Sequence, residues 1–132
     1  MYAVALGSTV SYSSHYGNEY THYQLDYTAN KANGWCPQES KLGEWIQVQC
    51  ESPKYWTDII MQGRGDADSW VTSIKVATSI NGKVWENVEK GKIYQTNSDR
   101  NTRVRITFSS AVYGRALRIY PQSWHKDISM RF

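Results

Sequence analysis

The sequence lacks most of the features that mark an enzyme, a metal protein or a membrane protein. Its two cysteines, Cys36 and Cys50, form no C-x-x-C pair and have no histidine at zinc-ligand spacing. No nucleophile elbow or phosphate-binding loop is present. No apolar run approaches the roughly 18–20 residues that cross a bilayer, and the first ten residues lack the basic start and apolar stretch of a signal peptide. We expect a protein without enzyme activity.

The composition indicates one folded domain over residues 1–132, with 40% hydrophobic and 20% charged residues. Phenylalanine is scarce, at 2 residues, whereas Trp contributes 6 and Tyr 10, and these polar-edged aromatics also serve wet recognition surfaces. Residues 1–74 hold 4 Lys/Arg and 8 Asp/Glu, and residues 75–132 hold 11 Lys/Arg and 4 Asp/Glu. The basic residues are interleaved rather than clustered, which favours solvated strand faces over a nucleic-acid surface.

Period-two alternation predicts strands and no long helix. It places Ile46, Val48 and Cys50 on one face, so Cys50 is either an inward thiol or, in an oxidising compartment, bridged to Cys36. Asn81-Gly82 predicts a tight hairpin turn. The pattern is typical of an all-β antiparallel sandwich or jelly roll of about eight strands, at 44–50, 56–62, 71–80, 84–88, 92–96, 102–108, 115–120 and 128–132.

The first 44 residues show little periodicity and predict long loops at one end of the sandwich. Within Ser13–Tyr27, Tyr16 and Tyr20 could stack on the apolar face of a sugar while Asn18 and His22 bond its hydroxyls. The alternative is that these aromatic residues only cap the end of the sandwich.

Two further polar segments are candidate binding loops. The first contains Arg64-Gly65-Asp66, a tripeptide that integrins bind, although an internal Arg–Asp bond that shapes the loop is the favoured interpretation. The second, 97–103, should lie beside it, and its Asp and Asn residues could instead bond their own backbone. The ligand-binding candidates from these segments are Arg64, Asp66, Asp68, Asp99 and Arg100.

The chain resembles the discoidin domain, or coagulation factor five/eight type C domain, and is most similar to the amino-terminal domain of the discoidin lectins. The resemblance implies an eight-stranded, galactose-binding-domain-like jelly roll with ligand loops at one end and no enzyme activity. It also implies an extracellular or cell-surface location. The residues that carry it are Asn33-Gly34-Trp35-Cys36-Pro37, Gly43-Glu44-Trp45-Ile46-Gln47-Val48, Ile60–Ser73, Ser79–Trp85, Asp99-Arg100-Asn101-Thr102 and Arg118–Trp124.

From the residues and the resemblance together we predict a carbohydrate-binding module for galactose-type glycans or glycoproteins in cell adhesion. Weak single sites predict an oligomer or a larger multidomain assembly. The alternatives are a protein-interaction domain, with an integrin among the partners, and an anionic phospholipid-binding module, which the acidic first half opposes. No cofactor is expected; Asp26, Thr28, Asn30 and Asn33 offer oxygen ligands to calcium, but without the acidic spacing of calcium-binding relatives.

Overall fold

The computed structural model describes residues 8–28 and 33–132. Within them it has strands and one short 3-10 helix, and no helix is long and apolar enough to cross a membrane. The expectation of an all-β fold is confirmed. The elements are β1 (Thr9–Tyr12), β2 (Ile46–Met61), β3 (Trp70–Ser79), β4 (Glu86–Asn87), η2 (Val88–Gly91), β5 (Tyr94–Gln95) and β6 (Val104–His125).

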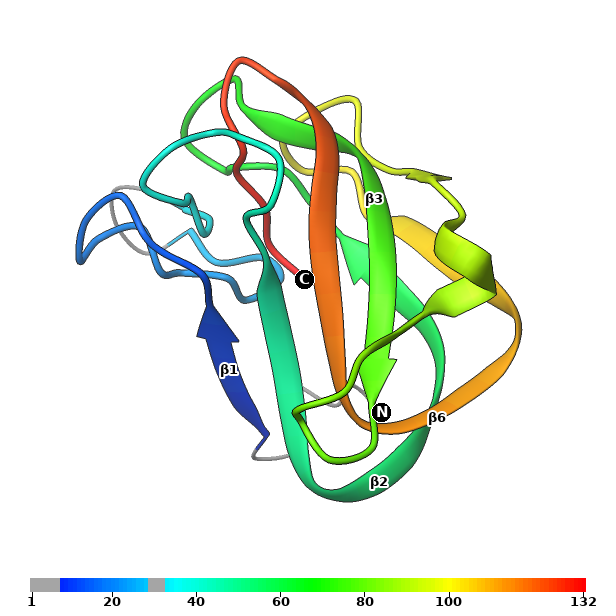
Figure 1. The fold of residues 1–132 in the computed structure, drawn as a ribbon. Coiled ribbons are helices and arrows are strands. Elements are labelled where there is room, and N and C mark those ends of the chain that lie inside the picture. Colours follow the sequence, from blue (N-terminus) through cyan, green and yellow to red (C-terminus); the bar gives the residue numbers. More distant parts are fainter. Residues whose placement is uncertain (1–7, 29–32) are drawn as a thin grey trace.

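The strands form one antiparallel sheet that curves over itself into two layers (Figure 1). The strand order is β1-β2-β6-β3-β4, with β5 paired to β3. The pairing of β2 with β6 shifts register between Gln49 and Lys54 and again between Trp56 and Asp58. Such irregularities bend a strand and increase its twist, so β2 and β6 each contribute to both layers.

The eight expected strands therefore map onto fewer, longer elements. The segments 44–50 and 56–62 overlap the two halves of β2, which spans 46–61. The segments 102–108 and 115–120 both fall on β6, which begins at residue 104. The carboxy-terminal segment 128–132 is not a regular strand, but isolated bridges pair its Met130 with Trp35 and its Arg131 with Gln62, the residue after β2. The jelly-roll sandwich is confirmed, while the division into strands differs because both long strands continue through their bends.

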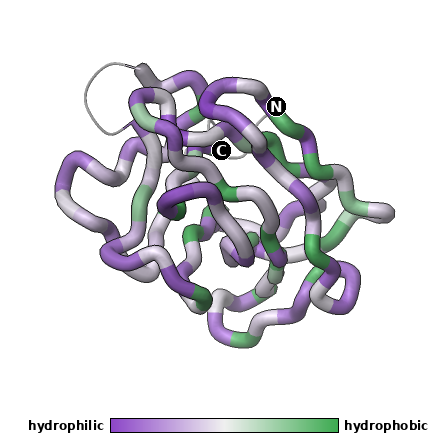
Figure 2. Tube along the Cα trace, turned by 90° about the horizontal axis from the view of Figure 1, so that it is seen from above, coloured by the Kyte–Doolittle hydropathy of each residue, from purple (hydrophilic) through white to green (hydrophobic). Residues whose placement is uncertain are grey.

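The core lies between the layers and is built from the predicted alternating positions. Ile46 and Val48 expose 0% and 2% of their surface, and Ile119 of β6 is fully buried. Figure 2 shows the consequence from above: hydrophobic and hydrophilic residues alternate along the trace instead of forming separate blocks. Cys36 and Cys50 are both buried and both free, so of the two alternatives for the cysteines the structure has unbridged thiols.

The connection after β3 is longer than the tight turn predicted for Asn81-Gly82. The β3–β4 pair nearest the connection is Thr78 with Glu86, and residues 80–85 form the connection between the two strands. The Asn81 side-chain oxygen accepts hydrogen bonds from the backbone N–H groups of Lys83 and Val84, at 2.8 and 2.9 Å. This Asx-type turn replaces the two-residue hairpin. Ile80 ends the predicted strand 71–80, whose alternation puts it on the face of Ile74 and Val76, and it is 62% exposed in the structure.

Candidate functional site

The loops gather at one end of the sandwich, the upper end in Figure 1, which we call the loop end. It consists of segments 13–28, 33–45, 63–69, 96–103 and 126–132. Backbone hydrogen bonds join them in pairs, for example from Tyr16 N to Cys36 O at 2.9 Å and from Gly65 N to Asn33 O at 2.8 Å. The prediction that the first 44 residues form loops at one end is confirmed for residues 13–28 and 33–44, whereas Thr9–Tyr12 form strand β1 at the edge of the sheet. Residues 1–7 and 29–32 of this stretch lie outside the described residues.

A pocket of about 360 Å³ opens at the loop end. Three predicted site residues line it: Tyr16 and Tyr20 from one loop, and Arg64 from a loop that is distant in the sequence. The Tyr16 and Tyr20 rings meet edge to face, with centroids 5.0 Å apart and planes at 77°. This is a favourable geometry for an aromatic pair, and it holds Tyr16 with 66% of its surface exposed to solvent.

The Arg64 guanidinium forms the polar wall of the pocket. Its Nε and one terminal nitrogen donate to the two carboxylate oxygens of Asp66, at 2.8 and 3.2 Å. The guanidinium carbon also lies 5.3 Å from the centre of the Tyr20 ring. The Asp66 hydrogen bond, more than the opposing burial, raises the pKa of Arg64. Among the described residues the other terminal nitrogen, Nη1, has no hydrogen-bond partner, so it can donate to a ligand.

Asp66 is an internal partner of this loop. Besides Arg64 it accepts a hydrogen bond from the Asn33 backbone N–H at 2.9 Å. The predicted intramolecular Arg–Asp bond is therefore present. An integrin would need the arginine and aspartate of the tripeptide Arg64-Gly65-Asp66 to be presented outward, and here the two side chains are engaged with each other.

The segments 63–69 and 97–103 lie side by side, as expected, and an ion pair joins them. Arg100 Nε donates to Asp68 at 2.8 Å, and this arginine lowers the pKa of Asp68. Asp99 accepts from the backbone N–H and the hydroxyl of Thr102, at 2.8 and 2.6 Å, and these bonds lower its pKa. Asp68, Asp99 and Arg100 thus shape the loops, and none of them lines the pocket.

The two remaining predicted residues are on the amino-terminal loop but outside the pocket lining. His22 stacks on Tyr27, with ring centroids 4.2 Å apart and planes at 9°. Asn18 is exposed in the turn between Tyr16 and Tyr20, where its backbone oxygen accepts the Thr21 hydroxyl at 3.3 Å. The sequence reasoning missed the polar and apolar pocket residues from later segments: Cys36, Pro37, Gln38, Ser40, Asp127 and Ile128.

Arg131 was also missed, and it connects the segments of the loop end. It belongs to the predicted strand 128–132, where it alternates with Ile128, Met130 and Phe132, and it is only 1% exposed. Burial lowers its pKa. Its guanidinium donates to the backbone oxygens of Gly63 and Arg100, each at 2.8 Å, to that of Tyr27 at 3.1 Å and to the Asn101 side chain at 2.8 Å. One side chain therefore ties together three loops.

Among the residues considered as calcium ligands, Asp26 is bound by two protein side chains. The Asp26 carboxylate accepts from the Gln62 amide at 2.9 Å and pairs with Arg103. The Arg103 hydrogen bond is the main cause of the lowered pKa of Asp26. Asn30 lies outside the described residues, and within 8–28 and 33–132 no group of three or more His, Cys, Asp or Glu residues is arranged to hold a metal ion.

The comparisons with known proteins point to one family. Residues 8–132 match the F5/8 type C domain. The chain is 30% identical over 132 residues to discoidin-2 of Dictyostelium discoideum, covering 96% of this chain and 51% of that protein. Wild-type discoidin II of Dictyostelium discoideum superposes with a TM-score of 0.91 at 27% identity, over 97% of this chain and 54% of that chain. A family 32 carbohydrate-binding module of C. perfringens NanJ, solved with galactose, shares the fold, with a TM-score of 0.69 at 16% identity over 94% of this chain and 87% of that one.

The predicted resemblance is thereby confirmed, and with it the class of protein. The chain spans about half the length of the discoidins it matches. Domains of this kind are typically non-catalytic recognition modules that bind carbohydrate or lipid. By its family match, its relatives and its structure, the chain belongs to the F5/8 type C, or discoidin, domain family.

Proposed function

We propose that this domain binds galactose-type glycans through the pocket at the loop end and acts in cell adhesion outside the cell. The observation that carries the proposal is the joining of Tyr16, Tyr20 and Arg64 in one open pocket. Sugars present an apolar C–H face and a rim of hydroxyls, and this pocket offers an aromatic face beside a planar donor. The galactose complex of the NanJ module, which has the same fold, is consistent with such a ligand.

Each pocket residue then has a defined task. The exposed Tyr16 ring stacks on the sugar, and the edge-to-face contact with Tyr20 holds that ring in place. Arg64 Nη1 donates to sugar hydroxyls while Asp66 orients the guanidinium from the other side. Among the predicted site residues, Asn18 contributes at the rim of the same turn. His22, Asp68, Asp99 and Arg100 support the loops and do not contact the sugar.

The shape of the pocket sets the expected strength of binding. A shallow single site that uses one aromatic face and a few hydrogen bonds should bind a monosaccharide with a dissociation constant of about micromolar to millimolar. Adhesion requires stronger attachment than this. Several linked pockets would provide it through avidity, which can exceed the single-site affinity by roughly 10²–10⁴.

Isothermal titration with free galactose and N-acetylgalactosamine tests the pocket without avidity. Tyr16→Ala and Arg64→Ala should each weaken binding about tenfold or more, since 1.4 kcal/mol is a factor of about 10. Matched controls are Tyr55→Ala, whose ring is 72% exposed at the other end of the molecule, and Arg105→Ala, whose guanidinium pairs with Asp58 on the surface. Both controls should leave the affinity unchanged.

Other results would favour the alternatives. Binding that persists in Tyr16→Ala and Arg64→Ala would contradict this pocket. A flat glycan array together with salt-sensitive sedimentation on phosphatidylserine vesicles would favour a phospholipid module. A flat array together with a stable partner on pull-down would favour a protein-interaction domain.

A further inference from the structure

Exposed hydrophobic side chains gather at the end of the sandwich opposite the pocket. We call this the far end; it consists of the β2 bend at 50–55, the β3–β4 connection at 80–85 and the β6 bend at 109–115, at the bottom of Figure 1. Seven large hydrophobic side chains of the described residues are exposed, and four belong to the far end: Tyr55, Ile80, Val84 and Tyr113, at 72%, 62%, 68% and 48%.

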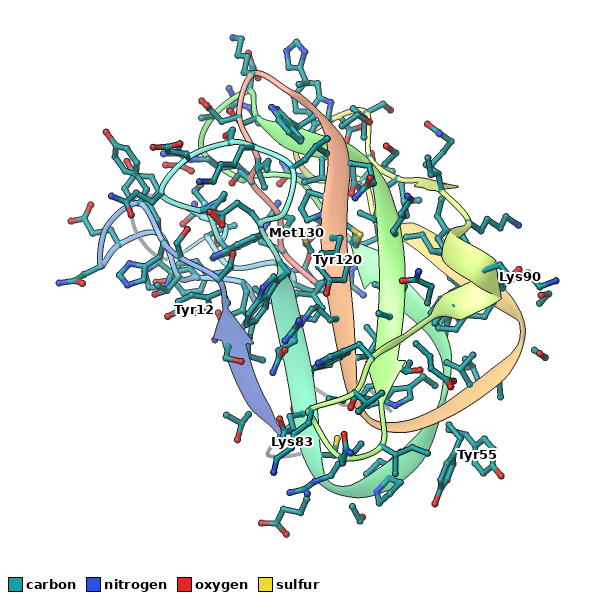
Figure 3. All side chains as sticks on the ribbon, in the orientation of Figure 1. Tyr12, Tyr55, Lys83, Lys90, Tyr120 and Met130 are labelled. Carbon is teal, nitrogen blue, oxygen red and sulfur yellow. The ribbon has the colours of Figure 1, made fainter. Side chains whose placement is uncertain are left out.

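Two of these side chains are in direct contact with each other. Tyr55 and Tyr113 are directly paired across β2 and β6, and their ring centroids lie 4.9 Å apart. Gly114, next to Tyr113, is packed so closely against the Ser79 backbone that an added Cβ would lie 3.1 Å from the Ser79 oxygen. The β3–β4 connection therefore lies against the β6 bend. Figure 3 shows Tyr55 and Lys83 projecting at this end, away from the core.

The charges around the far end are of both signs and are not paired. Glu51, Lys54, Lys83 and Glu86 are exposed, and none has an ion-pair partner among the described residues. The loop end differs, because there Arg64, Arg100 and Arg103 each pair with an aspartate. The half-buried Arg115 of the β6 bend adds a third basic group, and its Nε donates to the Cys50 backbone oxygen at 3.1 Å. Three basic groups beside two glutamates are not the basic collar that an anionic membrane attracts. Charges of both signs fit a surface that binds a second copy of itself, because a two-fold axis can place the basic groups of one copy against the acidic groups of the other.

We propose that the far end is the contact surface for a second copy of this chain. At about 200 Å² for a whole aromatic side chain, Tyr55 and Tyr113 alone offer on the order of 240 Å² per copy. Ile80, Val84 and the charged side chains extend the contact toward the roughly 600 Å² per partner of small interfaces. The expected product is a weak, reversible dimer.

If the proposed sugar binding holds, the far-end dimer would also serve adhesion. Two copies joined through their far ends place their loop ends on opposite sides of the dimer. The two pockets then face away from each other, which suits a bridge between two glycan-bearing surfaces. The dimer contact itself requires no sugar.

Sedimentation velocity of the chain, from micromolar to millimolar concentration, tests the contact. The average mass should rise toward twice the monomer mass, and the double variant Tyr55→Ser/Tyr113→Ser should weaken association at least tenfold. Tyr16→Ser, which removes an equally exposed tyrosine at the loop end, should associate like the unmodified chain. All three substitutions are at exposed positions, so folding should be unaffected.

A charge exchange tests the pairing itself. Lys54→Glu/Lys83→Glu makes the far end acidic, and Glu51→Lys/Glu86→Lys makes it basic. Neither variant should associate with itself, while an equimolar mixture should form dimers.

A chain that stays monomeric throughout the range, or that associates unchanged without its far-end tyrosines, overturns the proposal. So does far-end binding to phosphatidylserine vesicles without self-association. Galactose affinity is measured in a separate experiment. If the unmodified chain does not bind galactose, the proposed sugar pocket is wrong, but the proposed dimer contact is unaffected.

Discussion

Replacing Arg131 with methionine should destabilise the domain and disorder the loop end. The substitution keeps a long side chain but removes the donors for four acceptors. The bond to the Gly63 oxygen is fully buried, and its loss should cost about 2 kcal/mol. The other three are partly buried, so water can replace them in part, and each should cost about 1 kcal/mol.

The total is reduced because folding no longer buries a charge. Arg131 has no carboxylate within ion-pair distance among the described residues, so the desolvation cost that methionine avoids is about 2 kcal/mol. The net loss in the free energy of unfolding should be about 3 kcal/mol. Arg131→Lys should lie between the two, because an ammonium group keeps the charge but cannot span all four acceptors.

Urea unfolding followed by tryptophan fluorescence measures this change, read as a lower midpoint at constant slope. The matched control is Arg105→Met. The Arg105 side chain is 63% exposed and pairs with Asp58, so this substitution should cost no more than about 1 kcal/mol. If Arg131→Met and Arg105→Met lose the same small amount, Arg131 does not hold the loops together and the reasoning from its burial is wrong.

Three further predictions concern backbone space, pH and thiols. Gly63→Ala should destabilise the domain by roughly 1–3 kcal/mol, because the added Cβ would lie 2.7 Å from a backbone oxygen and from a neighbouring side chain. In Gly17→Ala the nearest atom is 3.5 Å from the added Cβ, so this control should cost less than about 1 kcal/mol in the same urea titration. Asp68→Asn should be less stable than the unmodified chain at pH 7 and equally stable in acid. Folding lowers the pKa of Asp68, so the stability that its carboxylate contributes is present above about pH 4 and is lost as the pH falls through the folded pKa. Equal destabilisation at every pH would contradict this prediction. A reducing agent should leave the melting temperature unchanged, because Cys36 and Cys50 are free, and a drop in melting temperature would reveal a bridge.

The fold could be predicted because its signal is local. In a strand, neighbouring side chains point to opposite faces, so alternating residues such as Ile46 and Val48 identify the inner face before the partner strand is known. The same rule failed at Ile80. There the chain had already left β3 for a turn organised by the Asn81 side chain, and the alternation no longer described its environment.

The candidate site could be predicted only in part. Tyr16 and Tyr20 are close in sequence, and an aromatic cluster on a loop is recognisable without a structure. Arg64 was a candidate for its hydrogen-bonding capacity, but its place beside Tyr20 depends on how two distant loops meet. His22 has similar chemistry, yet its stacking on Tyr27 takes it out of the pocket lining.

The sequence by itself determined the strand faces, the class of the fold and the family, because each of these follows from neighbouring residues along the chain. Tertiary structure alone decided which loop residues share a pocket, which acidic groups are already paired and where Arg131 lies. An arginine on an alternating segment is usually solvated, and this one is buried because the carbonyl oxygens of three loops surround it. Those oxygens belong to every residue type, so no side-chain pattern could have shown where they would meet.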